Sequence, residues 1–308
     1  MINVFFAAAP ARWPIYEDAL RKAFAEAGLT VDLSLDHAPD QVDYIIYAPN
    51  SGVTDFTPFT RAKAVLNLWA GVENVVHDET LNIPLARMVE TGLTDGMVEW
   101  VTAHVLRHHI GIDTNLRRQD GVWRQEVPPL AKDRRVTILG LGELGAACAK
   151  MLVQLKFDVR GWSRSAKSIE GVHCFSGDEL DQALTGTDIL VLLLPLTPAT
   201  EDILNADRIA LLAKGAVVLN PGRGALIDDD ALLAALDSGH LKHATLDVFR
   251  TEPLPADHPY WSHPKVTVTP HVASETRAET SSQTIAENIR RAEAGLPLLH
   301  IVDRDRAY

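Results

Sequence analysis

The stretch VTILGLGELGAACAKML, residues 136–152, decides how the rest of the sequence is interpreted. A β-branched, apolar run leads into Gly140, and small and apolar residues follow Gly145, which predicts a strand, a tight turn and a helix. The glycines at 140, 142 and 145 suit the tight turn, the close approach of backbone to a pyrophosphate, and helix–strand packing. The start of the helix offers unpaired N–H groups and a favourable dipole to phosphates. We therefore predict a dinucleotide-binding loop in which the side chain of Glu143 points to solvent.

Two series of short strand-like runs alternate with helix-like segments along the chain. The series that contains this loop reads RVTILGLG, DVRGWS, DILVLLLP, AVVLNPG, HATLDVF and VTVTPH. An earlier series reads INVFFAA, TVDLSL, DYIIYAP, AVLNLWA and IPLARM. This alternation predicts βαβ units and parallel sheets, and the apolar, β-branched runs of the later series predict strands that are buried on both faces.

Helical spacing marks residues 16–27, which end at Gly28, a long segment at 95–110, and 276–294 near the end of the chain. The last of these segments follows the second series, so it can return the chain to the first domain. We expect an α/β fold of two Rossmann- or flavodoxin-like, doubly wound parallel-sheet domains, with the active site in the cleft between them. The predicted domains are a discontinuous substrate-binding domain, 1–96 and 276–308, and a dinucleotide-binding domain, 97–275.

Composition narrows the classes of function. The chain has 308 residues, 46% of them hydrophobic, and a net charge of −12 without a Lys/Arg-rich run, which argues against nucleic-acid binding. The two cysteines, Cys148 and Cys174, give no disulfide framework, and Cys148 is expected to be packed. The longest apolar run, 189–194, is far shorter than the roughly 18 residues that a membrane helix needs. We interpret the N-terminal MINVFFAAAPA as a strand and expect a cytoplasmic protein.

The end of the second strand of the later series indicates the cofactor. A protein that binds NAD normally has Asp or Glu about 20 residues after the glycines, to accept hydrogen bonds from the ribose. This chain has Ser163 there, followed by Arg164, Ser165 and Lys167. An acid would repel a 2′-phosphate, whereas a serine leaves room and cations supply charge-assisted bonds. The pattern predicts NADPH in preference to NADH, with a solvated basic turn as the alternative.

Three motifs follow buried strands, and each carries a residue type that 2-keto acid chemistry needs. NPGRG contains Arg223, LDVFRTEP contains Asp247 and Glu252, and VTVTPH contains His271. The carboxyl ends of parallel strands lie at one edge of a sheet, where ligands bind in open α/β folds. Each motif taken alone is weak, but the three occur in order behind a dinucleotide loop.

Reduction of a 2-keto acid requires a hydride and a proton for the emerging alkoxide. A neighbouring carboxylate favours the protonated form of an imidazole, so we predict that His271 is the general acid and that Glu252 orients it. An arginine between two glycines at a strand end needs an anionic partner. We predict that Arg223 binds the substrate carboxylate and polarises the keto oxygen.

These motifs resemble those of the D-2-hydroxyacid dehydrogenase family over nearly the whole chain, with an N-x-x-R-G arginine, an L-D-V-F-x-x-E-P glutamate and a T-P-H histidine. Within it, LWAGVENV, WSRSAKS, LLPLTPAT and VDRDRAY are most similar to the A-type glyoxylate/hydroxypyruvate reductases. The resemblance implies a homodimer built from the helix and arm around 95–123, and a nicotinamide contact from Asp247. The implied cofactor contacts are Gly140, Gly142, Glu143, Leu144, Gly145, Ser163, Arg164, Ser165, Lys167, Leu194, Pro195, Leu196, Thr200, Asn220, Pro221, Gly222 and Asp247. The implied substrate contacts are Tyr47, the backbone N–H groups around Trp69, Ala70, Gly71 and Val72, and the side chains of Arg223 and His271.

Two departures from the family pattern concern the preferred substrate. Pro221 and Gly222 precede Arg223, where the family more often has small residues other than proline. Tyr47 stands at a strand end where related reductases can have tryptophan, so the substrate pocket can differ in size. Bulkier 2-keto acids therefore remain an alternative to glyoxylate and hydroxypyruvate.

Three further alternatives are a related enzyme, a dinucleotide-sensing binding protein and a metal site. Formate dehydrogenase, a related protein, has glutamine in place of the acid of the histidine pair, and Glu252 argues against it. Dinucleotide-sensing corepressors keep the catalytic trio, but they usually carry disordered extensions. His104 and His108 have i, i+4 spacing with His109 beside them, which could hold zinc, but no third ligand is evident and a solvated or interface helix is favoured.

Overall fold

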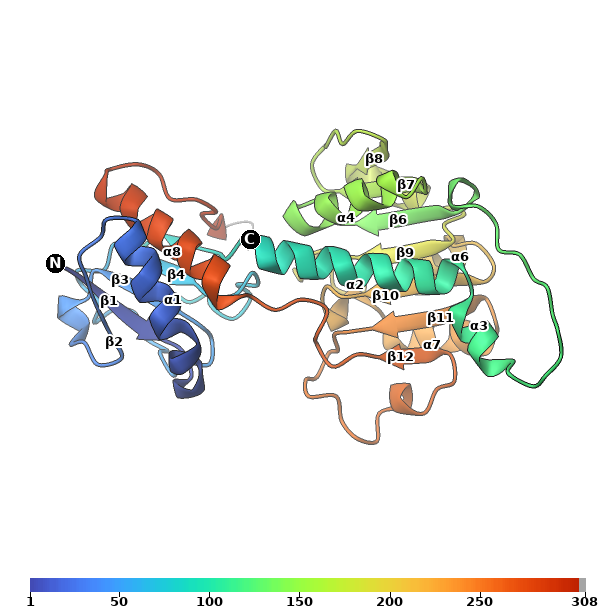
Figure 1. The fold of residues 1–308 in the computed structure, drawn as a ribbon, viewed down its shortest axis with the longest axis horizontal. Coiled ribbons are helices and arrows are strands. Elements are labelled where there is room, and N and C mark those ends of the chain that lie inside the picture. The colour runs from blue at the N-terminus through green and yellow to red at the C-terminus, as the bar shows by residue number, and fades with distance from the viewer. Residues whose placement is uncertain (305–308) are drawn as a thin grey trace. The chain divides into compact units, whose positions relative to one another are not determined.

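The computed structural model describes residues 1–304, and the chain forms two compact units (Figure 1). One unit contains residues 1–93 and the chain from Glu275 onward, and the other contains Thr94–Ser274. The chain therefore passes twice between the units. The assignment of substrate and dinucleotide to the two parts, with boundaries at 96/97 and 275/276, stays a prediction.

The first unit is built on a five-stranded parallel sheet in the order β2-β1-β3-β4-β5. Its strands are β1 Ile2–Ala7, β2 Val31–Ser34, β3 Tyr44–Tyr47, β4 Ala64–Asn67 and β5 Leu85–Ala86. Its long helices are α1 Trp13–Glu26 and α8 Ala278–Glu293. The order is that of flavodoxin-like folds, which confirms the predicted class.

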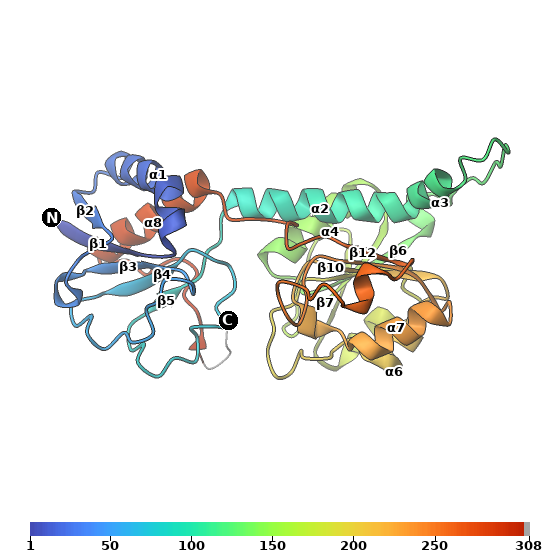
Figure 2. The ribbon, with the colours of Figure 1, turned by 90° about the horizontal axis from the view of Figure 1, so that it is seen from below.

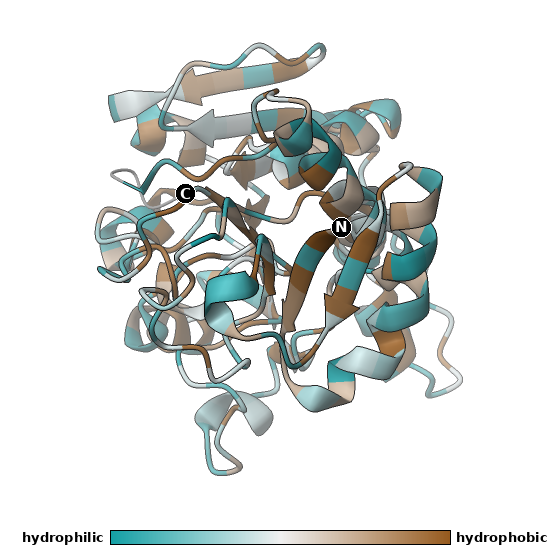
Figure 3. Cartoon of the chain, turned by 90° about the vertical axis from the view of Figure 1, so that its left-hand side faces the viewer, coloured by the Kyte–Doolittle hydropathy of each residue, from teal (hydrophilic) through white to brown (hydrophobic). Residues whose placement is uncertain are grey.

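Alternation along the strands divides the core of the first unit between the two faces of its sheet. Val4 and Phe6 of β1 pack in one cluster with Leu20 of α1 and Ile285 of α8. Side chains of opposite parity, among them Ile45, pack in a second cluster formed largely by connecting segments. Figure 2 shows α1 and α8 against the same sheet, and in Figure 3 its strands are mostly brown while the nearby helices mix teal and brown.

The second unit contains a seven-stranded parallel sheet in the order β12-β11-β10-β9-β6-β7-β8. Its strands are β6 Arg135–Leu139, β7 Asp158–Ser163, β8 Val172–Ser176, β9 Ile189–Leu192, β10 Ala216–Asn220, β11 Leu241–Leu246 and β12 Val266–Val268. Its helices are α2 Thr91–His109, which starts in the first unit, α3 Ile112–Arg117, α4 Glu143–Gln154, α5 Leu180–Leu184, α6 Ala206–Leu211 and α7 Asp229–Asp237. The strand order reverses between β6 and β9, the point at which doubly wound sheets bind ligands.

Both faces of this sheet are covered, as the apolar strands predict. Val136 and Ile138 of β6 pack with residues of α2 and α4. Leu190 and Leu192 of β9 pack on the other face with residues of α5, α6 and α7. The strands are therefore buried from both sides, and their carboxyl ends are the accessible edge at which polar side chains can gather.

The structure also corrects some details of the predicted elements. Helix α2 begins at Thr91 rather than at residue 95, and β8 lies at the sheet edge, where no strand was predicted. The arm expected after the long helix, up to about residue 123, starts as the short helix α3. Gly28 and Gly295 follow α1 and α8 with φ of 71° and 69°, as expected of residues that end helices. Among residues 1–304, no helix is both long and apolar enough to cross a membrane.

Candidate active site

The glycine loop after β6 has the close contacts that its sequence predicts. Gly140 has a φ of 105°, and a Cβ at this position would lie 2.5 Å from the carbonyl oxygen of Leu193. A Cβ at Gly145 would lie 1.8 Å from the carbonyl oxygen of Gly140. Neither position can hold a side chain without moving backbone, so these two glycines build the turn and seat α4 against the sheet.

Gly142 differs from the other two, because its Cβ position faces open space. Among the described residues, no atom comes within 4 Å of that position beyond its chain neighbours. Gly142 is the N-cap of α4, and no side chain caps the helix. Glu143 is exposed, as predicted, and Leu144 is half-buried. An uncapped helix start beside an open backbone cradle fits the pyrophosphate of a dinucleotide.

The end of β7 places a small buried hydroxyl before an exposed basic turn. Ser163 is 8% exposed, and its Oγ donates a hydrogen bond to the carbonyl oxygen of Ser165 at 2.8 Å. Arg164, Ser165 and Lys167 are all exposed. The serine therefore shapes the turn, and the cations stand at the position where a 2′-phosphate is predicted.

The segment after β9 is a compact turn held by one threonine. The Oγ1 of Thr200 donates to the carbonyl oxygen of Pro195 at 2.7 Å and accepts a bond from the N–H of Thr197. Leu194 is buried, while Pro195 and Leu196 are half-buried. These implied cofactor contacts thus belong to a turn that is held by its own hydrogen bonds.

The loop after β10 that carries Arg223 is fixed by the buried side chain of Asn220. Asn220 Nδ2 donates to the carbonyl oxygen of Arg223 at 2.9 Å, and its Oδ1 accepts from the N–H of Gly222. A Cβ at Gly222 would lie 2.8 Å from the carbonyl oxygen of Leu192. In this structure Asn220 shapes the loop, and Pro221 is buried within it. The cofactor contacts implied for Asn220, Pro221 and Gly222 stay predictions.

Gly224, on the other side of Arg223, brings two of the motifs together. A Cβ at Gly224 would lie 2.0 Å from the carbonyl carbon of Phe249, in the loop that leads to Glu252. Arg223 itself is half-buried, and its Nη1 donates to the carbonyl oxygen of Gly222 at 2.7 Å. The two glycines around the arginine are therefore required by close backbone packing.

Glu252 and His271 form the predicted acid–histidine pair. The Nδ1 of His271 lies 2.7 Å from Oε2 of Glu252, and Oε1 of Glu252 accepts a bond from the N–H of Phe249. His271 has a φ of 54°, a strained value for a residue with a side chain. Its side chain is 53% exposed. The carboxylate thus occupies one ring nitrogen and leaves Nε2 for another partner.

Asp247 holds the loop that carries His271 in place, a role that the sequence did not reveal. Asp247 is 0% exposed. Its carboxylate accepts bonds from the N–H groups of Val272 and Ala273 at 3.0 and 2.9 Å and from the hydroxyl of Thr269 at 2.5 Å. Its own carbonyl oxygen accepts from the N–H of His271. The nicotinamide contact implied for Asp247 stays a prediction.

In the first unit, the segment predicted to hold the substrate carboxylate turns around Asn67. Asn67 is 1% exposed, and its Nδ2 donates to the carbonyl oxygens of Trp69 and Gly71, both at 2.8 Å. Within the described chain, no hydrogen bond uses the N–H of Ala70, Gly71 or Val72. Such a run of free N–H groups is a suitable site for an anion. Asn67 was missed, and its one signal was an asparagine at the end of a buried strand.

Tyr47, the other predicted substrate contact of this unit, lies at the end of β3 and is 4% exposed. Its ring packs edge-on against Phe56 with centroids 5.4 Å apart. Burial and, to a lesser degree, the charge of Asp78 raise the pKa of its hydroxyl above the usual value. Tyr47 is therefore a neutral, packed side chain.

The histidines of α2 contact different partners. His108 Nε2 lies 3.0 Å from the hydroxyl of Thr245, His104 packs on Trp100, and His109 packs on Phe157. Among residues 1–304, no group of three His, Cys, Asp or Glu side chains has the arrangement of a metal site. His108 and His109 therefore pack α2 against the second unit, whereas the partner of His104 belongs to α2 itself.

Stability should fall on mild acidification because His108 and His243 are buried as neutral rings. Burial, helped by nearby positive charge, lowers the pKa of His108 to about 3 and that of His243 to about 4. The unfolded chain binds these protons first, so stability is complete above about pH 6.5 and is lost as pH falls toward the folded values. Urea unfolding from about pH 6.5 to 5 should show a loss of up to about 1.4 kcal/mol per pH unit for each histidine. The His243→Asn variant should show a shallower slope, and an unchanged slope would contradict this account.

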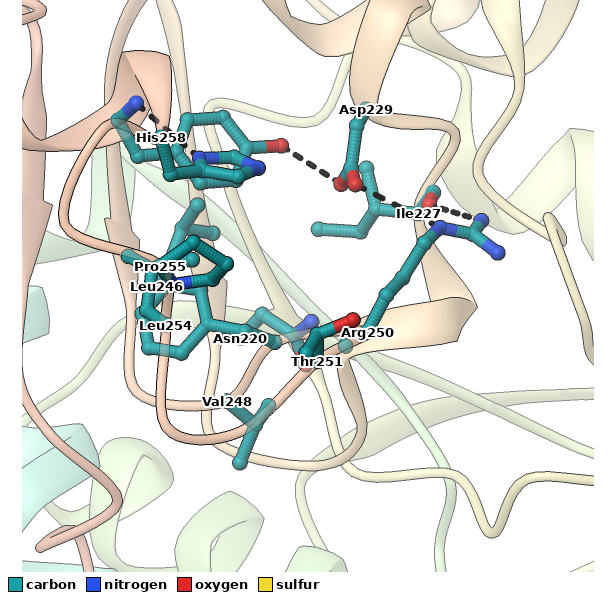
Figure 4. A pocket seen from close by; sticks show the side chains of 13 residues that line it. Asn220, Ile227, Asp229, Leu246, Val248, Arg250, Thr251, Leu254, Pro255 and His258 are labelled. Atoms are coloured by element: carbon teal, nitrogen blue, oxygen red, sulfur yellow. Dashed lines mark hydrogen bonds and ion pairs between the residues drawn. The ribbon is translucent and has the colours of Figure 1, made fainter.

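A cavity of about 230 Å³ lies behind the loops that carry Arg223 and Glu252 (Figure 4). Its lining includes Arg250, which bonds to Asp202 and the carbonyl oxygen of Ile227, and Tyr260, whose hydroxyl donates to Asp229 at 2.7 Å. The lining does not include Arg223, Glu252 or His271. The charged groups of the lining bond to one another and to neighbouring residues, which stabilises these loops.

Comparison with known proteins places this arrangement in one family. The family model described as D-isomer specific 2-hydroxyacid dehydrogenase, NAD binding domain, matches residues 100–273. A curated relative from Serratia proteamaculans, glyoxylate/hydroxypyruvate reductase A, is 43% identical over 252 residues, covering 79% of this chain and 80% of the relative. A Yersinia enterocolitica protein of the same name is 41% identical, covering 80% of this chain and 82% of that protein.

Solved structures of related proteins match this chain over its full length. A D-isomer specific 2-hydroxyacid dehydrogenase from Xanthobacter autotrophicus, crystallised with NADPH and MES, is 41% identical with a TM-score of 0.93, covering 100% of this chain and 99% of that one. An NADPH-dependent glyoxylate/hydroxypyruvate reductase from Sinorhizobium meliloti, crystallised with NADP and sulfate, is 36% identical with a TM-score of 0.83 and the same coverage. This chain therefore belongs to the D-isomer specific 2-hydroxyacid dehydrogenase family.

Proposed function

We propose that this chain is an NADPH-dependent reductase of small 2-keto acids that converts glyoxylate to glycolate and hydroxypyruvate to D-glycerate. The observation that supports this most strongly is the contact of 2.7 Å between His271 Nδ1 and Glu252 Oε2. This pair lies at the carboxyl edge of the seven-stranded sheet. In the glycine loop at the same edge, the Cβ position of Gly142 faces open space. The names of the relatives from Serratia and Sinorhizobium support the choice of substrate.

Each side chain of the proposed site has a defined role. When bound, NADPH supplies the hydride that the keto carbon receives. His271, with Nδ1 held by Glu252, gives the proton on Nε2 to the forming alkoxide. Arg223 binds the substrate carboxylate and polarises the keto oxygen. The N–H groups of Ala70–Val72, in the first unit, are also proposed to bind a substrate carboxylate.

The proposed cofactor contacts are those that the family resemblance implies, and the geometry of the loops supports them. The open N-terminus of α4 would hold the pyrophosphate, and the turn after β7 would hold the 2′-phosphate. The turn after β9 and the loop after β10 would line the remainder of the dinucleotide. The residues proposed are Gly140, Gly142, Glu143, Leu144, Gly145, Ser163, Arg164, Ser165, Lys167, Leu194, Pro195, Leu196, Thr200, Asn220, Pro221, Gly222 and Asp247.

The experiment that tests the function is NADPH oxidation with a panel of 2-keto acids, namely glyoxylate, hydroxypyruvate, pyruvate and phenylpyruvate. We expect the first two to have the highest kcat/KM. A preference for phenylpyruvate would support the alternative of a larger pocket around Tyr47. Tight NADPH binding without turnover of any acid would overturn the proposal in favour of a dinucleotide-sensing binding protein.

The basic turn after β7 gives a prediction about the cofactor. Replacing Arg164 and Lys167 together by alanine should raise KM for NADPH by about 10²-fold or more, because charge-assisted bonds to the 2′-phosphate are each worth about 1.5–3 kcal/mol. KM for NADH should change little. Lys214→Ala, at another exposed position of the same unit, is the matched control. A wild-type enzyme that prefers NADH would show that the turn is only a solvated surface.

We also propose that the protein is a cytoplasmic homodimer. Large apolar side chains are exposed just after α2, on α3 and on the segment that follows, where a second copy would cover them. They are Ile110, Ile112, Leu116, Val122, Trp123, Val127 and Leu130. Trp123, which is 92% exposed, is the largest of them.

A further inference from the structure

The C-terminal segment of the chain docks onto the first unit beside β5. The N–H of Val302 donates to the carbonyl oxygen of Leu85 at 2.8 Å, and the N–H of Arg87 donates to that of His300 at 3.0 Å. Ala86 and Ile301 form an antiparallel bridge. The segment therefore covers the edge of the parallel sheet in a fixed register.

Val302 joins this segment to the apolar cluster beneath the predicted carboxylate site. It is 5% exposed and shares that cluster with Val72, Val75, Val76 and Leu81. These four residues belong to the turn that continues directly from the N–H groups of 70–72. The terminal segment and the turn are thus packed against each other as well as against the sheet.

Arg304 fixes the turn more directly, because its guanidinium reaches three backbone carbonyls. Nε donates to the carbonyl oxygen of Val76 at 2.9 Å, Nη2 to that of Asp78 at 2.6 Å, and Nη1 to that of Leu81. The guanidinium is planar and rigid, so three such bonds fix the turn in one shape.

The held turn determines where the predicted anion site lies. The N–H groups of Val75 and Val76 both donate to the carbonyl oxygen of Val72, at 2.9 and 2.8 Å. Asn67 holds Trp69 and Gly71 from the sheet side. The N–H groups between these anchors are therefore positioned by Asn67 at one end and by the guanidinium of Arg304 at the other.

We propose that Arg304 is a positioning residue for 2-keto acid binding, which holds the turn 72–81 and through it the N–H groups of 70–72. The bonds of its guanidinium go to the backbone of the turn, so its proposed effect on substrate acts through the turn. The inference rests on the proposed function for its effect on substrate, whereas its effect on the turn can be measured without substrate.

The test compares Arg304→Gln with Arg291→Gln. Arg291 is also an arginine of this unit that donates to a backbone carbonyl of the terminal region, that of Pro297 at 2.6 Å. Two quantities are measured on the full-length protein. One is hydrogen exchange at the amides of 70–81, and the other is the set of KM and kcat values for glyoxylate and NADPH.

R304Q should accelerate exchange across 70–81 and raise KM for glyoxylate about tenfold, the effect of losing about 1.4 kcal/mol of binding, with KM for NADPH unchanged. R291Q should leave both quantities as in the wild type. Unchanged exchange in R304Q, an unchanged KM for glyoxylate, or equal effects of R291Q would each overturn the inference. If the wild type reduces no keto acid, the proposed function fails, while exchange still decides whether Arg304 holds the turn.

Discussion

Replacing His271 by asparagine should lower kcat for glyoxylate reduction by about 10²- to 10⁴-fold, the range expected when a general acid is lost. The side chain lies 2.7 Å from Glu252 through Nδ1, which leaves Nε2 to give the proton. Asparagine is the suitable replacement because it tolerates a positive φ, and His271 has a φ of 54°. The change therefore removes the proton donor without adding backbone strain.

The matched control for this variant is His263→Asn. His263 also pairs with a carboxylate, since its Nε2 lies 3.2 Å from Asp237, and it belongs to the same unit but to none of the three motifs. H263N should keep the wild-type kcat. NADPH binding, measured by fluorescence titration, should be equal in both variants and the wild type. If H271N kept its kcat within tenfold of the wild type, His271 would not be the general acid.

Much of the fold could be predicted because buried strands and glycine loops leave local signals. The apolar runs of the later series correspond to β6, β7, β9, β10, β11 and β12. Strand β8 was missed because it is an edge strand whose residues are mostly half-buried, so its run VHCFS lacks the apolar character of its neighbours. The early start of α2 was missed because helix ends carry weaker signals than helix interiors.

The residues of the candidate site also fall into those that the sequence reveals and those that it does not. Arg223, Glu252 and His271 could be found because each follows a strand, and strand ends share one edge. Residues that hold the site in place could not, because their partners are backbone groups far away in the sequence. Asp247 binds the N–H of Val272, and Arg304 binds carbonyl oxygens more than two hundred positions earlier. Such bonds depend on tertiary structure and leave no periodic pattern.

Replacing Arg223 by glutamine should lower kcat/KM for glyoxylate by 10³-fold or more, with both a higher KM and a lower kcat. Loss of one preorganised donor to a developing oxyanion costs about 10²- to 10³-fold in kcat, and the lost carboxylate partner adds to KM. Glutamine keeps a polar side chain in a loop that is fixed independently by Asn220, Gly222 and Gly224. The loop should therefore keep its shape, so the loss reports on the guanidinium.

Two further variants separate the charge of Arg223 from its shape and from general damage. Arg223→Lys keeps the charge but loses the planar, forked guanidinium. It should therefore recover only part of the kcat/KM for glyoxylate that R223Q loses. Arg208→Gln removes an arginine of the same unit that pairs with Asp181, and it should behave as the wild type. If R223Q raised only KM for NADPH, the arginine would serve the cofactor. Because Arg223 is proposed to act on both binding and turnover of the keto acid, that result would exclude its role as the group that binds the substrate carboxylate.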